Sequence, residues 1–170
     1  MISQNNVEKI NKAIEEFLTK MTLRDFSLEV GVNNVVEKNN GPDTAVVQIT
    51  TNEPQMLIGQ NGQTLFELER ILRILLNKKL SKSVVGGTDE PENFYISVDV
   101  NGYKNKKVEY LKKIASDAAV EVLQTGQKKI LPSMPAHERR IIHATLSGRQ
   151  DIKTESQGEE KDRRIIISLK

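Results

Sequence analysis

The chain has 170 residues, of which 37% are hydrophobic and 28% are charged, and its formal net charge is +2. This length allows one domain or two small ones, and the large charged fraction favours small domains with much surface. The absence of cysteine excludes disulfides and thiolate metal sites. No apolar run approaches the roughly 20 residues that cross a bilayer, and residues 1–6 lack a secretory pattern, so we expect a cytoplasmic protein without a membrane span.

The net charge is unevenly distributed along the chain. Residues 1–100 carry 10 Lys and Arg against 14 Asp and Glu, whereas residues 101–170 carry 15 against 9. A basic C-terminal part attracts polyanions such as nucleic acid. A basic surface that only aids solubility has the same composition, so charge alone leaves both interpretations open.

The first 100 residues predict the order helix, strand, strand, helix, helix, strand. Alternation of apolar and polar residues predicts strands over 26–30, 45–49 and 94–100. Helical periodicity predicts helices over 7–21, 54–58 and 62–80. Glycine and proline predict a turn over 39–43 and a loop over 81–93.

A pair of glycines lies between the second and third of these helices, in the order Gly59, Gln60, Asn61, Gly62. Glycine lets the backbone turn tightly, and the first amides of a helix have no partner within it. A helix that begins in this way suits a phosphate. Most glycine pairs only make turns, but this pair has strand sequence before it and a long helix and a strand after it.

The C-terminal part predicts two helices and three short strands. The helices are expected over 103–125, followed by Gly126 as a cap, and over 136–146 after a proline. The strands are expected over 128–131, 151–156 and 163–169.

Arg139 and His143 lie four residues apart on the second of these helices, so their side chains share one face. We expect both to be exposed. A guanidinium offers forked donors and an imidazole donates or stacks, which suits a phosphate or a base edge. On its own, such a pair is more often solvated surface.

Two patterns resemble known nucleic-acid-binding domains. The order strand, helix, Gly-x-x-Gly, helix, strand resembles the type II KH domain. Pro-Met-Pro-x-His-Glu-Arg-Arg-Ile-Ile-His, followed by Thr-Glu-Ser-Gln-Gly-Glu and Arg-Arg, resembles the R-3-H domain, named for an Arg and a His separated by three residues. Their succession is similar to the C-terminal portion of the bacterial Jag family, also called KhpB or EloR, over about residues 25–170.

This resemblance implies an α/β (α+β) fold, with a three-stranded KH-like sheet and its helices joined to a small R-3-H domain. The expected domains are a KH-like domain at 1–101 with an N-terminal helix, a connecting helix at 102–125 and an R-3-H-like domain at 126–170. Family members often carry an N-terminal Jag domain and a charged linker, and we expect this chain to have neither.

The resemblance also implies a non-catalytic protein that binds single-stranded RNA, or single-stranded DNA, as a regulator or chaperone. No cofactor and no metal are expected. Many KH loops carry Lys or Arg between the glycines, whereas this loop is neutral, so its affinity is expected to be modest. The residues expected to contact RNA are Gly59, Gln60, Asn61, Gly62, Arg139, Arg140, His143, Lys153 and Arg163.

Two other functions compete with RNA binding. In one, the KH surface pairs with a second copy or with a small KH protein, and such apolar pairing resists salt whereas RNA binding does not. In the other, His137 and Glu138 begin a zinc-protease helix, but that motif needs a second histidine at position 141, which is Ile141. The sequence therefore favours a binding protein over an enzyme.

Aromatic residues are few, and none follows Tyr110. Stacking is therefore not expected to dominate binding by the C-terminal module, where charge is expected to act instead. We expect the phenylalanines to fill the core rather than to stack on bases. The seven aromatic residues are Phe17, Phe26, Phe66, Phe94, Tyr95, Tyr103 and Tyr110.

Overall fold

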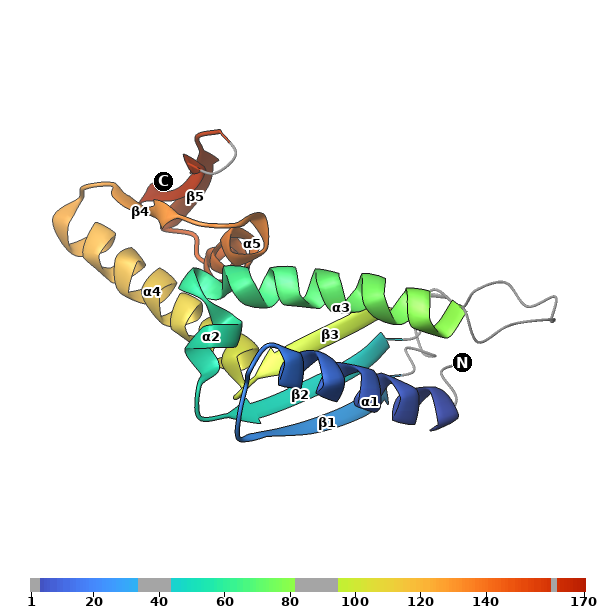
Figure 1. Ribbon diagram of the computed structural model, residues 1–170. Coiled ribbons are helices and arrows are strands. Elements are labelled where there is room, and N and C mark those ends of the chain that lie inside the picture. The colour runs from blue at the N-terminus through green and yellow to red at the C-terminus, as the bar shows by residue number, and fades with distance from the viewer. Residues whose placement is uncertain (1–3, 34–43, 82–94, 160–161) are drawn as a thin grey trace. The chain divides into compact units, whose positions relative to one another are not determined.

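The computed structural model describes residues 4–33, 44–81, 95–159 and 162–170 (Figure 1). The chain divides into two compact units, residues 1–103 and residues 104–170. Each unit has its own core and its own three-stranded sheet, and each is described by itself. The expected α+β fold class is confirmed.

The first unit places two helical segments between parallel strands. Its sheet has the order β1-β2-β3, in which β1 and β2 are antiparallel and β2 and β3 are parallel. Parallel neighbours need a long crossover, and the segment with the two glycines is part of it. The elements are α1 (Gln4–Lys20), β1 (Phe26–Asn33), β2 (Thr44–Thr51), α2 (Pro54–Ile58), the 3-10 turn η1 (Gln60–Gly62), α3 (Gln63–Ser81) and β3 (Tyr95–Val100).

One face of this sheet is buried under α1 and α3, which Figure 1 shows on the same side of the strands. Alternation along β2 buries Ala45, Val47 and Ile49 and turns the residues between them outward. Helical spacing buries every third or fourth residue of α1 and α3. These helix residues are Ile10, Ile14 and Leu18 in α1 and Leu65, Leu68, Leu72 and Leu76 in α3.

A backbone knuckle ends the first unit. Asn101 and Gly102 both have positive φ, of 51° and 69°, a conformation that asparagine and glycine adopt more readily than other residues. The Asn101 side chain accepts a hydrogen bond from the Thr51 amide at 3.0 Å and donates one to the Thr51 carbonyl at 2.8 Å. The end of β3 is thus fixed to the end of β2.

The second unit is an antiparallel sheet covered by helices. Its strand order is β4-β6-β5, so β4 is an edge, where Pro132 is tolerated beside a shift in register. Besides α4 (Tyr103–Thr125), the elements are β4 (Lys129–Ser133), α5 (Ala136–Leu146), β5 (Ile152–Gln157) and β6 (Arg164–Leu169).

Helix α4 contributes directly to the core of this unit. Its buried residues are mostly small, which allows close approach to the other elements of that core, among them Ile142 of α5 and Ile165 of β6. Helix α4 is therefore part of the second unit's core as well as a connection between the units. The domain boundaries 1–101, 102–125 and 126–170 stay a prediction. The buried residues of α4 are Leu111, Ala115, Ala118, Ala119 and Val122.

Most expected elements occur, with ends shifted by a few residues. The helices expected over 54–58, 103–125 and 136–146 have the predicted bounds. The turn expected over 39–43 lies outside the described residues, as does the loop expected over 81–93, apart from Ser81, which belongs to α3. Among the described residues, no helix has both the length and the hydropathy that a membrane crossing requires.

Candidate nucleic-acid interface

The glycine loop is held in a conformation that most residues avoid. Gly59 and Gly62 have φ of 67° and 83°, and Asn61 between them has φ of 54°. The Gly59 amide donates to the Gln55 carbonyl at 2.9 Å and ends α2, and α3 begins at Gln63. Three residues with positive φ within four positions are consistent with a loop whose shape is set before any ligand binds.

Packing also requires glycine at both ends of this loop. A Cβ at Gly59 would overlap the Thr64 side chain, and a Cβ at Gly62 would lie 3.0 Å from the Tyr103 ring and its hydroxyl oxygen. Both glycines therefore have a structural reason to be present, whatever the loop binds. Gln60 and Asn61 are exposed, so the loop presents neutral amide groups to solvent.

The Arg139–His143 pair docks on strand β5 of the second unit. Four helical residues rise about 6 Å and two strand residues rise about 6.6 Å, so this pair matches Thr154 and Ser156 in spacing. His143 Nδ1 lies 2.7 Å from the Thr154 hydroxyl, and Arg139 Nη1 donates to the Ser156 hydroxyl. Neither side chain is fully exposed. The expectation that both would be exposed is therefore wrong, because the neighbouring strand supplies partners.

Two guanidinium groups meet at one hydroxyl oxygen. Arg163 Nε donates to Ser156 Oγ at 3.1 Å, and Arg139, which shares that oxygen, also donates through Nε to the Met134 carbonyl at 3.2 Å. Among the described residues, neither arginine has a carboxylate as an ion-pair partner. We call Arg139, His143, Thr154, Ser156 and Arg163 the arginine–serine cluster. Among the described residues, the oxygens that accept from the two guanidinium groups are neutral, namely the Ser156 hydroxyl and the Met134 carbonyl.

The charge state of His143 follows from this environment. Burial lowers its pKa from the ordinary 6.5, and the nearby charge of Arg139 lowers the pKa further. The imidazole is therefore neutral at pH 7. An anion placed between His143 and Arg139 would offset both causes and favour protonation of the ring.

The structure does not bring the other two expected basic contacts into this cluster. Lys153 precedes Thr154 on β5, so its side chain lies on the opposite face of the strand, where it pairs with Glu155. Arg140 is exposed and lies about 100° around α5 from Arg139. The four expected contacts of the glycine loop belong to the first unit, and the cluster belongs to the second.

Two residues of the cluster were not among the expected contacts. Thr154 and Ser156 alternate with charged residues on β5, and Ile152 is buried on the same face of that strand. That alternation in the sequence indicates which hydroxyls face the helix. The signal identifies the strand face but not the helix residues that dock on it.

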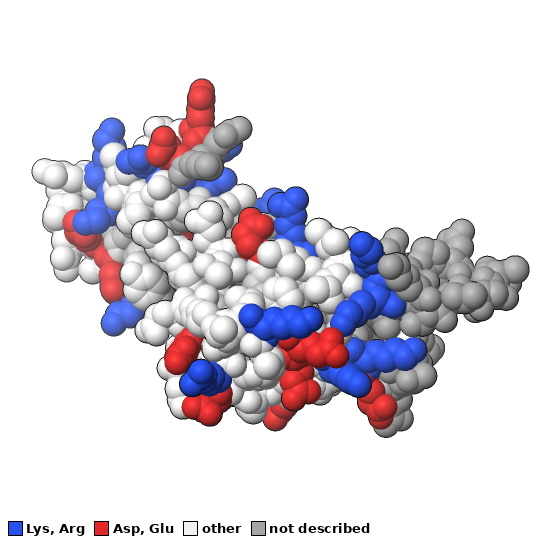
Figure 2. All heavy atoms as spheres, viewed as in Figure 1, with Lys and Arg blue, Asp and Glu red and all other residues white. Residues whose placement is uncertain are grey.

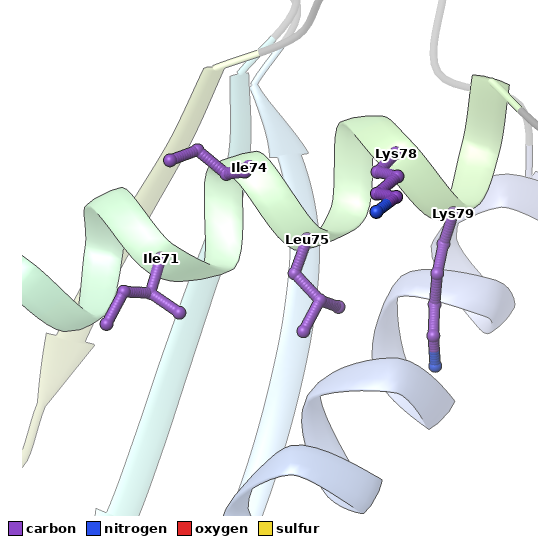
Figure 3. Close-up of a pocket in the computed structure, with 5 residues that line it drawn as sticks. All are labelled: Ile71, Ile74, Leu75, Lys78 and Lys79. Atoms are coloured by element: carbon purple, nitrogen blue, oxygen red, sulfur yellow. The ribbon is translucent and has the colours of Figure 1, made fainter.

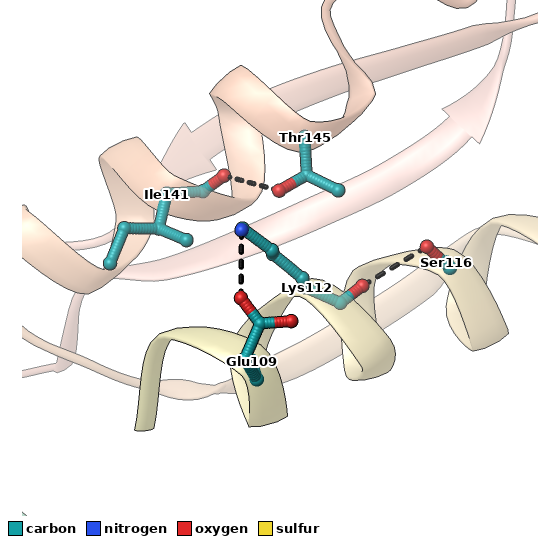
Figure 4. A network of polar contacts seen from close by, with 5 residues as sticks. All are labelled: Glu109, Lys112, Ser116, Ile141 and Thr145. Carbon is teal, nitrogen blue, oxygen red and sulfur yellow. Dashed lines mark hydrogen bonds and ion pairs between the residues drawn. The ribbon is translucent and has the colours of Figure 1, made fainter. Parts of the chain in front are cut away.

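Several lysines near the start of α4 are engaged by carboxylates. Lys107 lies 3.4 Å from Glu138, a residue of α5 that is 4% exposed, and Lys112 lies 2.8 Å from Glu109 (Figure 4). On the face drawn in Figure 2, basic side chains lie among acidic ones. The arginine–serine cluster differs from these lysines, since no described carboxylate pairs with Arg139 or Arg163.

The expectation that the phenylalanines fill the core is wrong for Phe66. Its side chain is 65% exposed, whereas Phe17 and Phe26 pack against the core of the first unit. Phe94 lies outside the described residues. Among the described residues, no three His, Asp or Glu side chains are placed to hold a metal ion.

The chain is similar to one domain family and to several known proteins. Residues 109–169 match the R-3-H domain. The chain is 33% identical over 166 residues to the RNA-binding protein KhpB of Bacillus subtilis, covering 96% of this chain and 74% of that protein. It is 31% identical over 161 residues to the RNA-binding protein KhpB of Clostridium symbiosum, covering 89% and 68%.

A third relative is considerably longer. The RNA-binding protein KhpB of Lactiplantibacillus plantarum is 27% identical over 142 residues, which are 84% of this chain and 41% of that protein. The chain therefore spans less than half the length of that relative.

Replacing Arg139 and His143 by alanine should weaken the second unit, because Ser156 and Thr154 would lose partners from α5. The expected loss in the free energy of unfolding is about 1–3 kcal/mol, measured by urea denaturation. Arg140→Ala is the control, and it should change stability by less than about 0.5 kcal/mol. Equal stability of both variants would show that the pair does not hold α5 on β5.

Stability should fall as the pH falls, in a window set by His143. Its pKa is lowered in the folded state, so the unfolded state binds more protons just below pH 6.5. The contribution of His143 to the free energy of unfolding is therefore fully present above about pH 6.5 and is lost as the pH falls below that value. Urea denaturation between about pH 5 and pH 8 should show this loss in the wild type and in His137→Gln. A loss of equal size in His143→Gln would assign the effect to other groups.

Proposed function

We propose that this chain, which belongs to the KhpB family, binds single-stranded RNA without catalysing a reaction. The match to the R-3-H domain and the names of the relatives support RNA as the ligand. The arginine–serine cluster is the single observation on which the proposal rests. We place its action in the cytoplasm, as a regulator or chaperone of RNA.

The arginine–serine cluster binds phosphate in this proposal. Arg139 and Arg163 already point at one oxygen atom, so a phosphate oxygen near Ser156 meets two guanidinium donors. Charge-assisted hydrogen bonds of this kind are stronger than those to a neutral hydroxyl. Arg140 is exposed on the next face of α5 and adds positive charge at the edge of the cluster. Lys153 lies on the opposite face of β5, so any contact that it makes with RNA is separate from the cluster.

The first unit acts as a KH-like domain in this proposal. Its two helical segments with Gly59–Gly62 between them cross from β2 to the parallel strand β3, which is the place of the RNA-clamping loop in such domains. Gln60 and Asn61 carry no charge, so this loop binds a sugar-phosphate backbone through amide groups. Single-stranded DNA fits the same contacts, except where the 2′-hydroxyl is read.

Arg163→Gln should weaken the binding of a labelled oligo(U) to the full chain. It should also reduce, by about one, the steepness with which the logarithm of the binding constant falls with the logarithm of the salt concentration. Arg163 is exposed, so folding should be unaffected. Arg149→Gln is the control, since Arg149 is paired with Asp151 at 2.8 Å and should change binding less. Anisotropy titrations at two salt concentrations measure both quantities.

The same assay tests the loop with a double variant, Gln60→Asp with Asn61→Asp. Acidic residues suit a helix start, so folding should survive while affinity falls about tenfold through repulsion of phosphate. Gln124→Asp with Gln127→Asp adds the same charge at exposed positions of the second unit. Equal effects of both pairs would assign the loss to net charge and remove the loop from the site.

A second candidate function is pairing through α3. Ile71 and Ile74 are 48% and 59% exposed, and with Leu75, Lys78 and Lys79 they line a hollow of about 530 Å³ (Figure 3). Exposed apolar side chains in a row are typical of a docking surface. We propose that a second copy, or another KH-like protein, covers this face. This role is compatible with RNA binding.

Pairing through α3 should be visible in sedimentation of the full chain. Ile71→Ser with Ile74→Ser should lower the association constant by at least about tenfold, and salt should have little effect on the wild-type value. Val120→Ser with Leu123→Ser, two exposed apolar residues of α4, is the control. A wild-type protein that sediments as a monomer at all concentrations would eliminate self-pairing.

A further inference from the structure

A stripe of one aromatic and two arginine side chains runs along α3 from the glycine loop. Phe66, Arg70 and Arg73 follow Gly62 at intervals of four, four and three residues, so they lie within one narrow stripe of the helix. Phe66 is 65% exposed and lies about one turn, roughly 5.4 Å, from Gly62. Arg73 is the last residue of the stripe, and its guanidinium carbon lies 5.9 Å from the centre of the Tyr95 ring.

This stripe differs from the apolar face of the same helix. At about 100° per residue, Ile74 lies about 80° around α3 from Phe66, and Ile71 lies about 140° away. A partner that covers Ile71, Ile74 and Leu75 therefore leaves Phe66 accessible, whereas Arg70, four residues before Ile74, borders the covered face. Helix α3 presents two surfaces of different chemistry.

Within the part of the chain that the structure describes, the Phe66 side chain lies outside the core of the first unit. It is not among the residues packed against the core of the first unit, although Leu65 and Leu68 on either side are buried. A single exposed apolar residue needs no explanation by itself. Phe66 matters because it lies about one turn from the glycine loop, where Gln60 and Asn61 are also exposed, so one ligand can reach both the loop and the ring.

We propose that Phe66 is a stacking platform for an unpaired nucleobase whose phosphate lies at Gly59–Gly62. The proposal rests on the proposed function and adds to it the way in which the first unit holds a nucleotide. One helical turn separates the loop from the ring, which is comparable with the reach from a phosphate to its own base. The flat face of an aromatic ring accepts every base, because each base has a π face.

The charges around this position balance and do not attract a phosphate, because Arg70 and Arg73 are matched by Glu67 and Glu69. Arg70 is 3.8 Å from Glu67, and both side chains are largely exposed, so their charges offset one another. Glu69 accepts a hydrogen bond from the Val98 amide at 3.1 Å and adds negative charge beside the stripe. With a neutral loop as well, stacking rather than charge supplies the affinity here, so its salt dependence should be shallow.

The test uses the full chain with short oligo(A) and oligo(U) in anisotropy titrations at low and at physiological salt. Phe66→Ala should weaken oligo(A) binding about tenfold, by the same factor at both salt concentrations. Uracil stacks less well than adenine, so the wild type should prefer oligo(A). The loss for oligo(U) in Phe66→Ala should be smaller, and the preference for oligo(A) should disappear. Phe66→Tyr should retain both affinity and preference, which a role in folding or packing alone would not predict.

Ile74→Ala is the matched control, because it truncates a similarly exposed residue of the same helix outside the stripe. It should leave RNA binding unchanged. Unchanged affinity and preference in Phe66→Ala, with wild-type binding still weakened by Arg163→Gln, would overturn stacking and leave the proposed function standing. Wild-type protein that binds neither oligonucleotide would overturn both. Altered sedimentation of Phe66→Ala without altered RNA binding would make Phe66 part of a protein contact instead.

Discussion

Because β2 and β3 pair in parallel, the chain between them has to cross from one end of the sheet to the other. The crossover contains α2 and α3, which bury Leu57 and the leucines of α3 against the core, and the glycine loop is the bend between them. The loop is thus supported on both sides by packed helices. Its shape depends on glycine, because Gly59 and Gly62 have positive φ and a Cβ at Gly62 would lie 3.0 Å from the Tyr103 side chain. A site built in this way offers a ligand a preformed surface rather than one that must be ordered on binding.

In the second unit, one hydroxyl organises the candidate site. Ser156 accepts from Arg139 and Arg163, so two like charges are held together, and no carboxylate of the described residues pairs with either. Two like charges in proximity repel one another, and a phosphate bound there, as proposed, would offset that repulsion. The buried pair Lys107–Glu138 lies elsewhere between α4 and α5, where it contributes to packing rather than to attraction. The charges that support packing and those proposed to bind phosphate are therefore separated within one small unit.

The two units differ in the way they attract a polynucleotide. The glycine loop and Phe66 offer neutral amides and an aromatic ring, and the second unit offers arginine. A chain that uses both gains from linkage, because binding at one site raises the effective concentration at the other. Salt should weaken the arginine contribution and leave stacking nearly unchanged. The apolar face of α3 is separate from both and leaves room for a protein partner.

The sequence by itself determined the order and type of the elements, because helical and strand periodicity are local properties. It placed α2, α4 and α5 at their observed bounds, and it located Gly59–Gly62 between two helices. Only the tertiary structure decided which side of each element is covered. It buried part of Arg139 and His143 against β5, turned Lys153 to the other face, drew α4 into a core and left Phe66 in solvent. Periodicity shows that a face exists, whereas its partner comes from elements distant along the chain.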